Sequence, residues 1–191
     1  MWTIGEEDLV AGSSNGDGDK HGAPLTGRRG WWRRVAAEYS GSADRPLGSY
    51  LGVMAAYAGF AGGLGLLARS LGRLNSPRAA DIVLAGVATH KVTRLIAKDP
   101  VTSPMRAPFT RFADRSGDAE LAEEARGTGL QKAIGELVSC PFCLGQWVAT
   151  GFTAGYLFAP RATRVIAAIF TEMAVADFLH FGYSAAEQAQ Q

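Results

Sequence analysis

Four long apolar stretches, separated by short polar turns and one long polar loop, dominate the pattern along the chain. Residues 47–68 contain no charged side chain, and at about 1.5 Å per residue they can cross a hydrocarbon core of about 30 Å. We expect further spans at residues 79–97, 141–158 and 162–183. The pattern therefore predicts an all-α fold, a polytopic membrane helical bundle of about four transmembrane helices over residues 47–185. A soluble bundle with buried helices is the alternative.

Polar segments flank and interrupt the apolar stretches. Residues 1–46 are dense in Gly, Ser, Asn and Asp near their centre and bury too little apolar area to offset the entropy of ordering, so we expect a disordered tail. Residues 98–140 form a polar loop, and residues 186–191 form a short C-terminal tail. Four apolar positions near the end of the loop share one helical face: Leu130, Ile134, Leu137 and Val138. They predict a short amphipathic helix on the membrane surface, and we find no convincing strand.

The distribution of Lys and Arg predicts how the segments are oriented. The chain holds 19 basic and 18 acidic residues, so its net charge gives no indication of a nucleic-acid partner. With four spans, the tail and the long loop carry twelve basic residues and the opposite turns carry five. This excess favours both termini on the cytoplasmic side of a bacterial cell membrane.

Paired tryptophans lie among four arginines shortly before the first predicted span. Trp prefers the headgroup level of a bilayer, and Arg is attracted to anionic lipid. We interpret the segment as a lipid-interface anchor made of Arg28, Arg29, Trp31, Trp32, Arg33 and Arg34. A nucleic-acid or protein patch is the alternative interpretation.

Small residues recur at a spacing of four in the first predicted span, at Ala55, Gly59 and Gly63. Small residues in this register let helices approach closely in lipid. The stripe predicts helix packing, and we favour packing within one chain over dimerisation.

Titratable side chains interrupt the second and fourth predicted spans at matching depth. Lys91 and Arg94 lie six and three residues before the inner end of one span, and Asp177 lies six before the inner end of the other. Because unpaired charge is costly in a bilayer, we expect Asp177 to pair with Lys91 or Arg94. The predicted intramembrane polar cluster comprises His90, Lys91, Arg94, Glu172, Asp177 and His180. A structural ion pair is favoured over a proton or ion path.

The tetrapeptide Cys140-Pro141-Phe142-Cys143 is the most chemical feature of the chain. Its spacing places two sulfurs one helical turn apart at a helix start, where a thiol can become reactive. Structural zinc normally takes four ligands, so His90 and His180 could complete a zinc site with Cys140 and Cys143, or two chains could pool their thiolates. Structural thiols, a metal site, and redox or acylation chemistry all remain open. No catalytic pattern is present, so we predict neither an enzyme nor any cofactor besides this zinc.

Two motifs in the second half of the chain carry a family resemblance. Residues 89–112 read THKVTRLIAKDPVTSPMRAPFTRF, and residues 135–150 read GELVSCPFCLGQWVAT. About residues 80–185 resemble a domain of unknown function, numbered 1360, of bacterial and phage membrane proteins that include a sporulation-associated protein of bacilli. The resemblance implies a membrane protein without a known activity. It implies these shared positions: Lys91, Arg94, Asp99, Arg106, Cys140, Cys143, Gly145 and Trp147.

Together these observations predict a small integral membrane protein with a structural or interaction role. It would contact lipid and present residues 98–138 to a cytoplasmic protein partner or a second copy. One alternative is a holin-like or channel-like protein that permeabilises membranes in a phage or lysis programme. Another is a cytoplasm-facing thiol or zinc-site protein.

Overall fold

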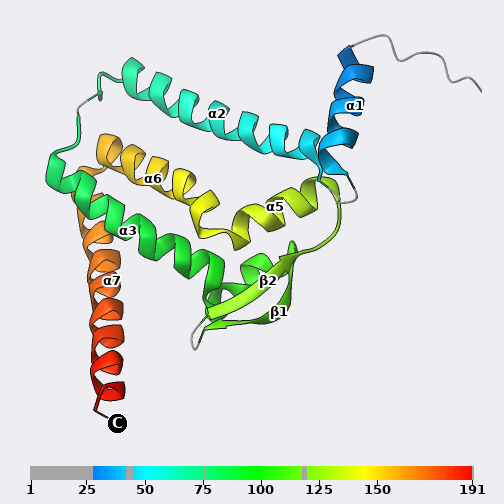
Figure 1. Ribbon diagram of the computed structural model, residues 1–191. Coiled ribbons are helices and arrows are strands. Elements are labelled where there is room, and N and C mark those ends of the chain that lie inside the picture. Colours follow the sequence, from blue (N-terminus) through cyan, green and yellow to red (C-terminus); the bar gives the residue numbers. More distant parts are fainter. Residues whose placement is uncertain (1–27, 42–44, 75, 118–119, 191) are drawn as a thin grey trace, which may run out of the picture.

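Helices dominate the computed structural model, which describes residues 28–41, 45–74, 76–117 and 120–190 (Figure 1). The predominance of helix predicted from the sequence is confirmed. The elements follow in this order: α1 (Arg28–Ser40), α2 (Leu47–Ser70), α3 (Ala79–Lys98), the 3-10 turn η1 (Pro100–Thr102), α4 (Ser103–Arg106), β1 (Thr110–Gly117), β2 (Glu120–Ala125), α5 (Gly129–Ser139), α6 (Pro141–Phe158) and α7 (Pro160–Gln188).

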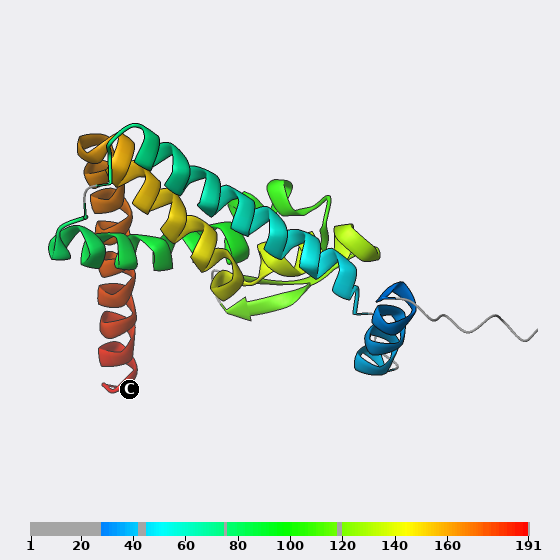
Figure 2. The ribbon, with the colours of Figure 1, turned by 90° about the horizontal axis from the view of Figure 1, so that it is seen from above.

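Helices α2 and α6 lie side by side and run in the same direction (Figure 2). The Tyr57 hydroxyl lies 3.0 Å from the Thr150 hydroxyl oxygen, midway along both helices. Farther along, the Arg73 guanidinium donates to the carbonyl oxygen of Phe158 at 3.0 Å. The Trp147 ring packs against Tyr57 at a centroid distance of 5.2 Å. Contacts between aromatic and polar side chains therefore hold α2 to α6.

A small core lies where α3, α6 and α7 meet. Its buried members are Ala88 of α3, Phe152 and Tyr156 of α6, and Ala167 of α7. Because the alanines carry no bulk beyond Cβ, the helices can approach closely around the two rings. At the α6–α7 turn a Cβ on Gly155 would lie 2.5 Å from a side-chain atom of Thr163, so this turn requires glycine.

A β-hairpin lies inside the loop, and the prediction of an all-α chain without strands is therefore wrong. Strand β1 pairs antiparallel with β2, from Thr110 opposite Ala125 to Gly117 opposite Glu120. Charged residues take three of the eight positions of β1 and three of the six of β2, and the regular alternation of apolar and polar positions that signals a strand is missing. Contacts from other elements, rather than an apolar face of its own, hold the hairpin in place.

The predicted amphipathic helix is present as α5, which packs on β2 and on α2. Its buried residues are Ala133 and Gly135, whereas Leu130 remains exposed. A Cβ on Gly135 would lie 2.4 Å from the carbonyl oxygen of Phe109, so only glycine allows α5 to approach the hairpin this closely. The small residues of α5, and not only its large apolar ones, define the packed face.

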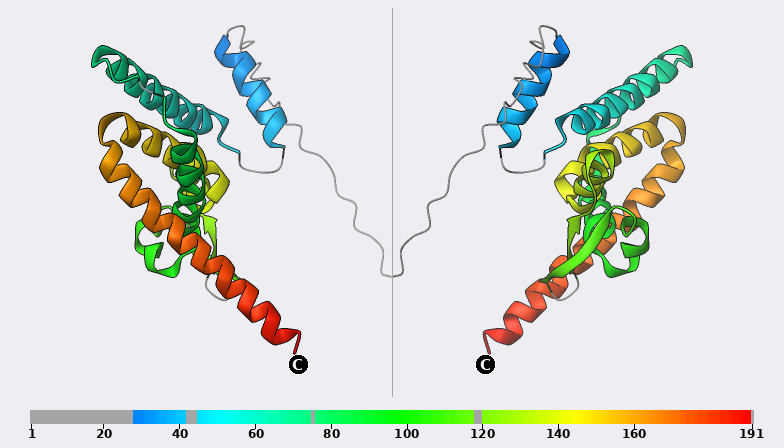
Figure 3. Two further views of the ribbon diagram at one scale, coloured as in Figure 1. Left: turned by 90° about the vertical axis from the view of Figure 1, so that its left-hand side faces the viewer. Right: turned by 90° about the vertical axis from the view of Figure 1, so that its right-hand side faces the viewer.

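The disordered tail predicted for residues 1–46 is wrong where residues 28–40 form α1. This stretch is rich in Arg and Ala, which favour helix, and the helix ends before Gly41, whose φ of 54° suits glycine. Residues 1–27 lie outside the described residues. Helix α1 stands apart from the main body, and α7 extends beyond it at the C-terminal end (Figure 3).

Two of the helices in the described ranges, α2 and α7, are long and apolar enough to cross a membrane. The predicted spans at residues 79–97 and 141–158 form α3 and α6 but do not reach that apolarity. Helix α3 carries Asp81, Lys91 and Arg94, and α6 includes Gln146 and two Thr residues. The structure therefore does not support four equally apolar spans.

Candidate functional site

A cavity of about 620 Å³ lies between the second half of α3, the middle of α7 and the ends of the hairpin strands. We call it the α3–α7 pocket. Charged side chains from all three elements line it: Lys91, Arg94, Asp99, Glu120 and Asp177. Apolar side chains of the two helices also line it: Leu95, Ala174, Phe178 and Phe181. The pocket therefore places ionic groups directly beside aromatic rings.

Two ion pairs cross the α3–α7 pocket. Lys91 Nζ lies 2.5 Å from Asp177 Oδ2, so the ion pair predicted between the second and fourth apolar stretches forms. Arg94 pairs instead with Glu120 at the start of β2. The sequence could not predict the second pair, because the hairpin that places Glu120 there has no recognisable strand pattern.

Of the remaining members of the predicted polar cluster, one lines the pocket and two do not. His90 lines the pocket and stacks on Phe178, with ring centroids 6.5 Å apart. The structure does not bring Glu172 or His180 into the pocket lining, and both are exposed. Glu172 lies five residues before Asp177, which turns it to another face of α7.

A further ion pair joins the beginnings of the same two helices. Arg164 donates to both carboxylate oxygens of Asp81, at 2.7 and 2.9 Å. Because Lys91 and Asp177 meet farther along, α3 and α7 run in the same direction and are joined at two levels. The sequence signal for this pair was one acidic and one basic residue near the starts of two predicted spans.

Arg106 is completely buried and forms the centre of a polar cluster below α3. Its Nε and Nη2 atoms donate to the two carboxylate oxygens of Glu123 at 2.9 and 2.6 Å. Its Nη1 atom donates to the carbonyl oxygen of Ile96 at 2.6 Å and to the Thr102 hydroxyl at 2.6 Å. We call these residues the Arg106 cluster. It fastens the end of α3 to the hairpin.

Neighbouring motif residues complete the Arg106 cluster. The Asp99 carboxylate accepts from the Val101 N–H at 2.8 Å and so caps η1. The Thr110 hydroxyl donates to Glu123 at 2.6 Å. Hydrogen bonds from Arg106 and Thr110 to the ionised carboxylate lower the pKa of Glu123, against the opposing effect of burial. The first motif therefore has a structural role, which depends on a glutamate that the motif does not contain.

The two cysteines lie at the start of α6. The Cys140 sulfur accepts from the backbone N–H of Cys143 at 3.2 Å and serves as the N-cap of the helix, with Pro141 in the first turn. Both cysteines are free, and Cys143 is exposed. This geometry gives Cys140 a structural role that needs no metal or redox chemistry.

The predicted four-ligand zinc site is not formed within one chain. Across the described ranges, no three His, Cys, Asp or Glu side chains are arranged to hold a metal ion. His90 stacks on Phe178 of α7, and His180 is exposed on α7. The two histidines therefore do not join Cys140 and Cys143 at the start of α6.

The predicted lipid-interface residues belong to α1. Trp31 and Trp32 lie with ring centroids 6.0 Å apart, and Trp31 is exposed, as are Arg33 and Arg34. The side chains of Arg28 and Arg29 lie outside the described part of the structure. The segment thus presents both aromatic and basic surface on one short helix.

The small-residue stripe of α2 is not used for packing within the chain, which corrects the preferred interpretation. Ala55, Gly59 and Gly63 are exposed, and a Cβ built on either glycine meets nothing within 4 Å. Helix α2 instead contacts the rest of the molecule through a face that carries Tyr50 and Tyr57. These larger side chains reach α5 and α6 without close approach of the helix axes.

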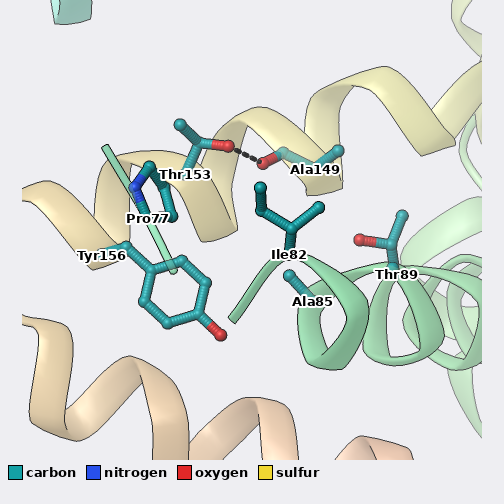
Figure 4. A pocket seen from close by; sticks show the side chains of 8 residues that line it. Pro77, Ile82, Ala85, Thr89, Ala149, Thr153 and Tyr156 are labelled. Atoms are coloured by element: carbon teal, nitrogen blue, oxygen red, sulfur yellow. Dashed lines mark hydrogen bonds between the residues drawn. The ribbon is translucent and has the colours of Figure 1, made fainter. Parts of the chain in front are cut away.

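A smaller cavity of about 260 Å³ lies between α3 and α6 (Figure 4). Ile82 and Thr89 of α3 line it together with Thr153 and Tyr156 of α6. The Thr153 hydroxyl donates to the carbonyl oxygen of Ala149 at 2.9 Å. The buried Thr89 and Tyr156 hydroxyls have no hydrogen-bond partner among the described residues. The cavity holds no charged group, so the α3–α7 pocket is the stronger candidate site.

Comparisons with known proteins point to one family. Residues 84–183 match the family model described as a protein of unknown function, DUF1360. Sporulation protein YjcA of Bacillus subtilis (strain 168) is 37% identical over 71 residues, which cover 36% of this chain and 60% of that protein. The UPF0713 protein YngL of the same strain is 31% identical over 78 residues, covering 39% of this chain and 56% of that protein. The chain therefore spans less than two thirds of the length of either relative. No solved structure matches it.

Proposed function

Because the chain belongs to the DUF1360 family, whose members have no established activity, we propose that it is a multi-pass protein of the bacterial cytoplasmic membrane. Its role is structural: the long helices hold residues 98–138, here called the cap, against the membrane for interaction with a partner. The observation that carries this proposal is the exposure of α2 and α7, the two described helices that are long and apolar enough to cross a membrane. Ala68 is the single buried residue of α2, and only Thr163, Ala167 and Ala174 are buried in α7.

Exposed apolar helices distinguish a lipid medium from a protein core. A core helix of a soluble protein can be as apolar as α2, but its large side chains are buried against neighbouring elements. Here large apolar side chains on both helices remain exposed: Leu51, Met54, Leu66 and Leu67 on α2, and Val165, Ile166, Ile169 and Val175 on α7. Surfaces of this extent on soluble monomers are rare. Lipid tails would cover them without further protein.

The alternating directions of the long helices support four crossings. Helices α2 and α6 run one way, and α3 and α7 run the other, as their contacts require. In this arrangement the charged groups Asp81, Lys91 and Arg94 of α3 pair with neighbours, and α6 carries no charged group. The cap then lies at the beginnings of α2 and α6, at the end of α3 and beside α7, on the cytoplasmic side with both termini.

Exposed apolar side chains on the cap support an interaction role. Val101 and Met105 precede the hairpin, Phe112 lies on β1 and Leu130 lies on α5, and all four are exposed. Ion pairs and hydrogen bonds fix the cap to the long helices, including a 2.5 Å hydrogen bond from the Tyr50 hydroxyl to Glu136. A rigid cap with exposed apolar residues suits a cytoplasmic protein partner or a second copy of the chain.

Membrane extraction and topology mapping test the proposal. We expect the full chain to need detergent for extraction. A fluorescent protein at the C-terminus should fluoresce, and alkaline phosphatase fused after residue 74 should be active. A chain that stays monodisperse in plain buffer would refute the membrane location. Membrane depolarisation on induced expression would instead support the permeabilising alternative, for which the exposed stripe at Ala55, Gly59 and Gly63 provides a surface for self-association.

A further inference from the structure

Both charged and aromatic side chains line the α3–α7 pocket, and the proposed structural role does not use it. We propose that this pocket binds the headgroup of a zwitterionic phospholipid of the ethanolamine type. The phosphate would bind Lys91 and Arg94, and the primary ammonium would bind the neighbouring carboxylates. This inference rests on the proposed membrane location, which supplies the lipid.

The charge of the lining favours a zwitterion over an anion. Besides His90, the described residues that line the pocket carry two cations and three carboxylates: Lys91, Arg94, Asp99, Glu120 and Asp177. A headgroup with a net negative charge would meet an excess of carboxylate. A headgroup with one phosphate and one ammonium finds a partner of opposite sign for each charge.

The ion pairs leave capacity for a ligand. An ammonium has three N–H donors, a guanidinium five, and a carboxylate about four acceptor positions. The side chains of Arg94 and Asp177 are 46% and 45% exposed, so a headgroup can reach them without unfolding. A phosphate can bridge Lys91 and Arg94 while a primary ammonium donates to the carboxylates. A choline headgroup has no N–H with which to make that second contact.

The position and shape of the pocket suit a lipid. Lys91 and Arg94 lie seven and four residues before the end of α3, about 10 and 6 Å along the helix and near the expected boundary of the hydrocarbon. Phe178 and Phe181 are exposed and line the pocket on the α7 side, beside Asp177. The volume of about 620 Å³ is typical of a small-molecule site.

Native mass spectrometry of the full chain in dodecyl maltoside tests the proposal. Dioleoyl phosphatidylethanolamine, phosphatidylcholine and phosphatidylglycerol are added in turn. We expect phosphatidylethanolamine to bind about tenfold more tightly than either other lipid, which corresponds to one charge-assisted contact. Arg94→Gln and Glu120→Gln should each remove that preference. The matched control is Arg111→Gln, because Arg111 forms an exposed ion pair with Glu124 and does not line the pocket.

Each other outcome overturns the proposal in an identifiable way. Equal binding of the three lipids, or an unchanged preference in folded Arg94→Gln and Glu120→Gln, removes the pocket as a headgroup site. If glycerophosphoethanolamine, which has no acyl chains, binds as tightly as phosphatidylethanolamine, the ligand is a free solute and not a lipid. If the chain can be extracted without detergent, the proposed membrane location fails. If the chain needs detergent but binds the three lipids equally, only the lipid-binding proposal fails.

Discussion

At the scale of single residues, Arg106 shows how context changes the role of a charge. Along the sequence it is one of six basic residues in a polar loop. In the structure it is 1% exposed and bonds to Glu123, to Thr102 and to the carbonyl groups at the end of α3. A buried cation is tolerated only where its donors are satisfied. Arg106 therefore organises the cap and does not contribute surface charge.

Replacing Arg106 with Met should unfold or loosen the cap. The change leaves the Glu123 carboxylate buried without its cation, and breaking a buried pair in this way costs about 3–5 kcal/mol. Thermal unfolding of the full chain in detergent measures the loss. The control is Arg111→Met on the same hairpin, whose exposed pair with Glu124 should contribute about 0.5 kcal/mol. Equal losses in the two variants would contradict the burial of Arg106.

Glu123 should make the cap less stable in acid. Since hydrogen bonds from Arg106 lower its pKa, folded protein binds this proton less readily than the unfolded chain. The stabilisation is complete above the unfolded pKa of about 4.3. It is lost as the pH falls through the lowered pKa of the folded state.

Thermal unfolding midpoints measured from neutral pH down through that range test this dependence. Glu123→Gln should flatten the acid side of the curve, while Glu124→Gln, at the exposed neighbouring position, should leave it unchanged. An acid slope that persists in Glu123→Gln would assign the effect to other carboxylates.

At the scale of elements, close approach of backbones decides how α5 meets the hairpin. Its sequence predicts an amphipathic helix from Leu130, Ile134, Leu137 and Val138, and that helix is present. The closest contact, however, is made at Gly135, where the helix meets the carbonyl oxygen of Phe109. Large apolar residues signal that a helix will pack, whereas a small residue determines where its axis can come nearest.

Gly135→Ala and Gly151→Ala form a matched pair that tests this contact. Replacing an exposed helical glycine with alanine stabilises the helix by about 1 kcal/mol. This applies to Gly151, because a Cβ built there meets nothing within 4 Å. At Gly135 the added Cβ would lie 2.4 Å from a carbonyl oxygen, so we expect a loss of about 1–3 kcal/mol instead. Opposite shifts of the unfolding midpoint are expected. Stabilisation by both variants would show that α5 lies farther from the hairpin.

At the scale of the whole molecule, ion pairs between distant segments set the relation of α3 to α7. Lys91 and Asp177 are 86 residues apart in sequence and 2.5 Å apart in space, and Asp81 and Arg164 repeat the arrangement at the other end. Pairs at two levels fix both the direction and the register of the two helices. In a low-dielectric medium, a partner of opposite charge at the same depth removes most of the cost of each charge.

A charge swap tests the pair at the α3–α7 pocket. Lys91→Glu alone and Asp177→Lys alone each place like charges together and should lower the unfolding midpoint. The double variant restores opposite charges and should recover an interaction of about 0.5–3 kcal/mol. The control combines Lys91→Glu with Arg111→Glu, which lies outside the pocket and should rescue nothing. Additive losses in the swapped double variant would contradict a direct pair.

The sequence alone determined the long helices, an ion pair of Asp177 with Lys91 or Arg94, and the family resemblance, because apolar length, the depth of a charge in its span and local motifs can be read along each segment. The structure selected Lys91 as the partner of Asp177. Tertiary structure decided the hairpin, the Arg106–Glu123 and Arg94–Glu120 pairs, and the exposed position of the α2 stripe. Each of these depends on which distant segments meet. Strands β1 and β2 lack a regular apolar alternation that would identify them, so only their contacts across the fold determine where they form.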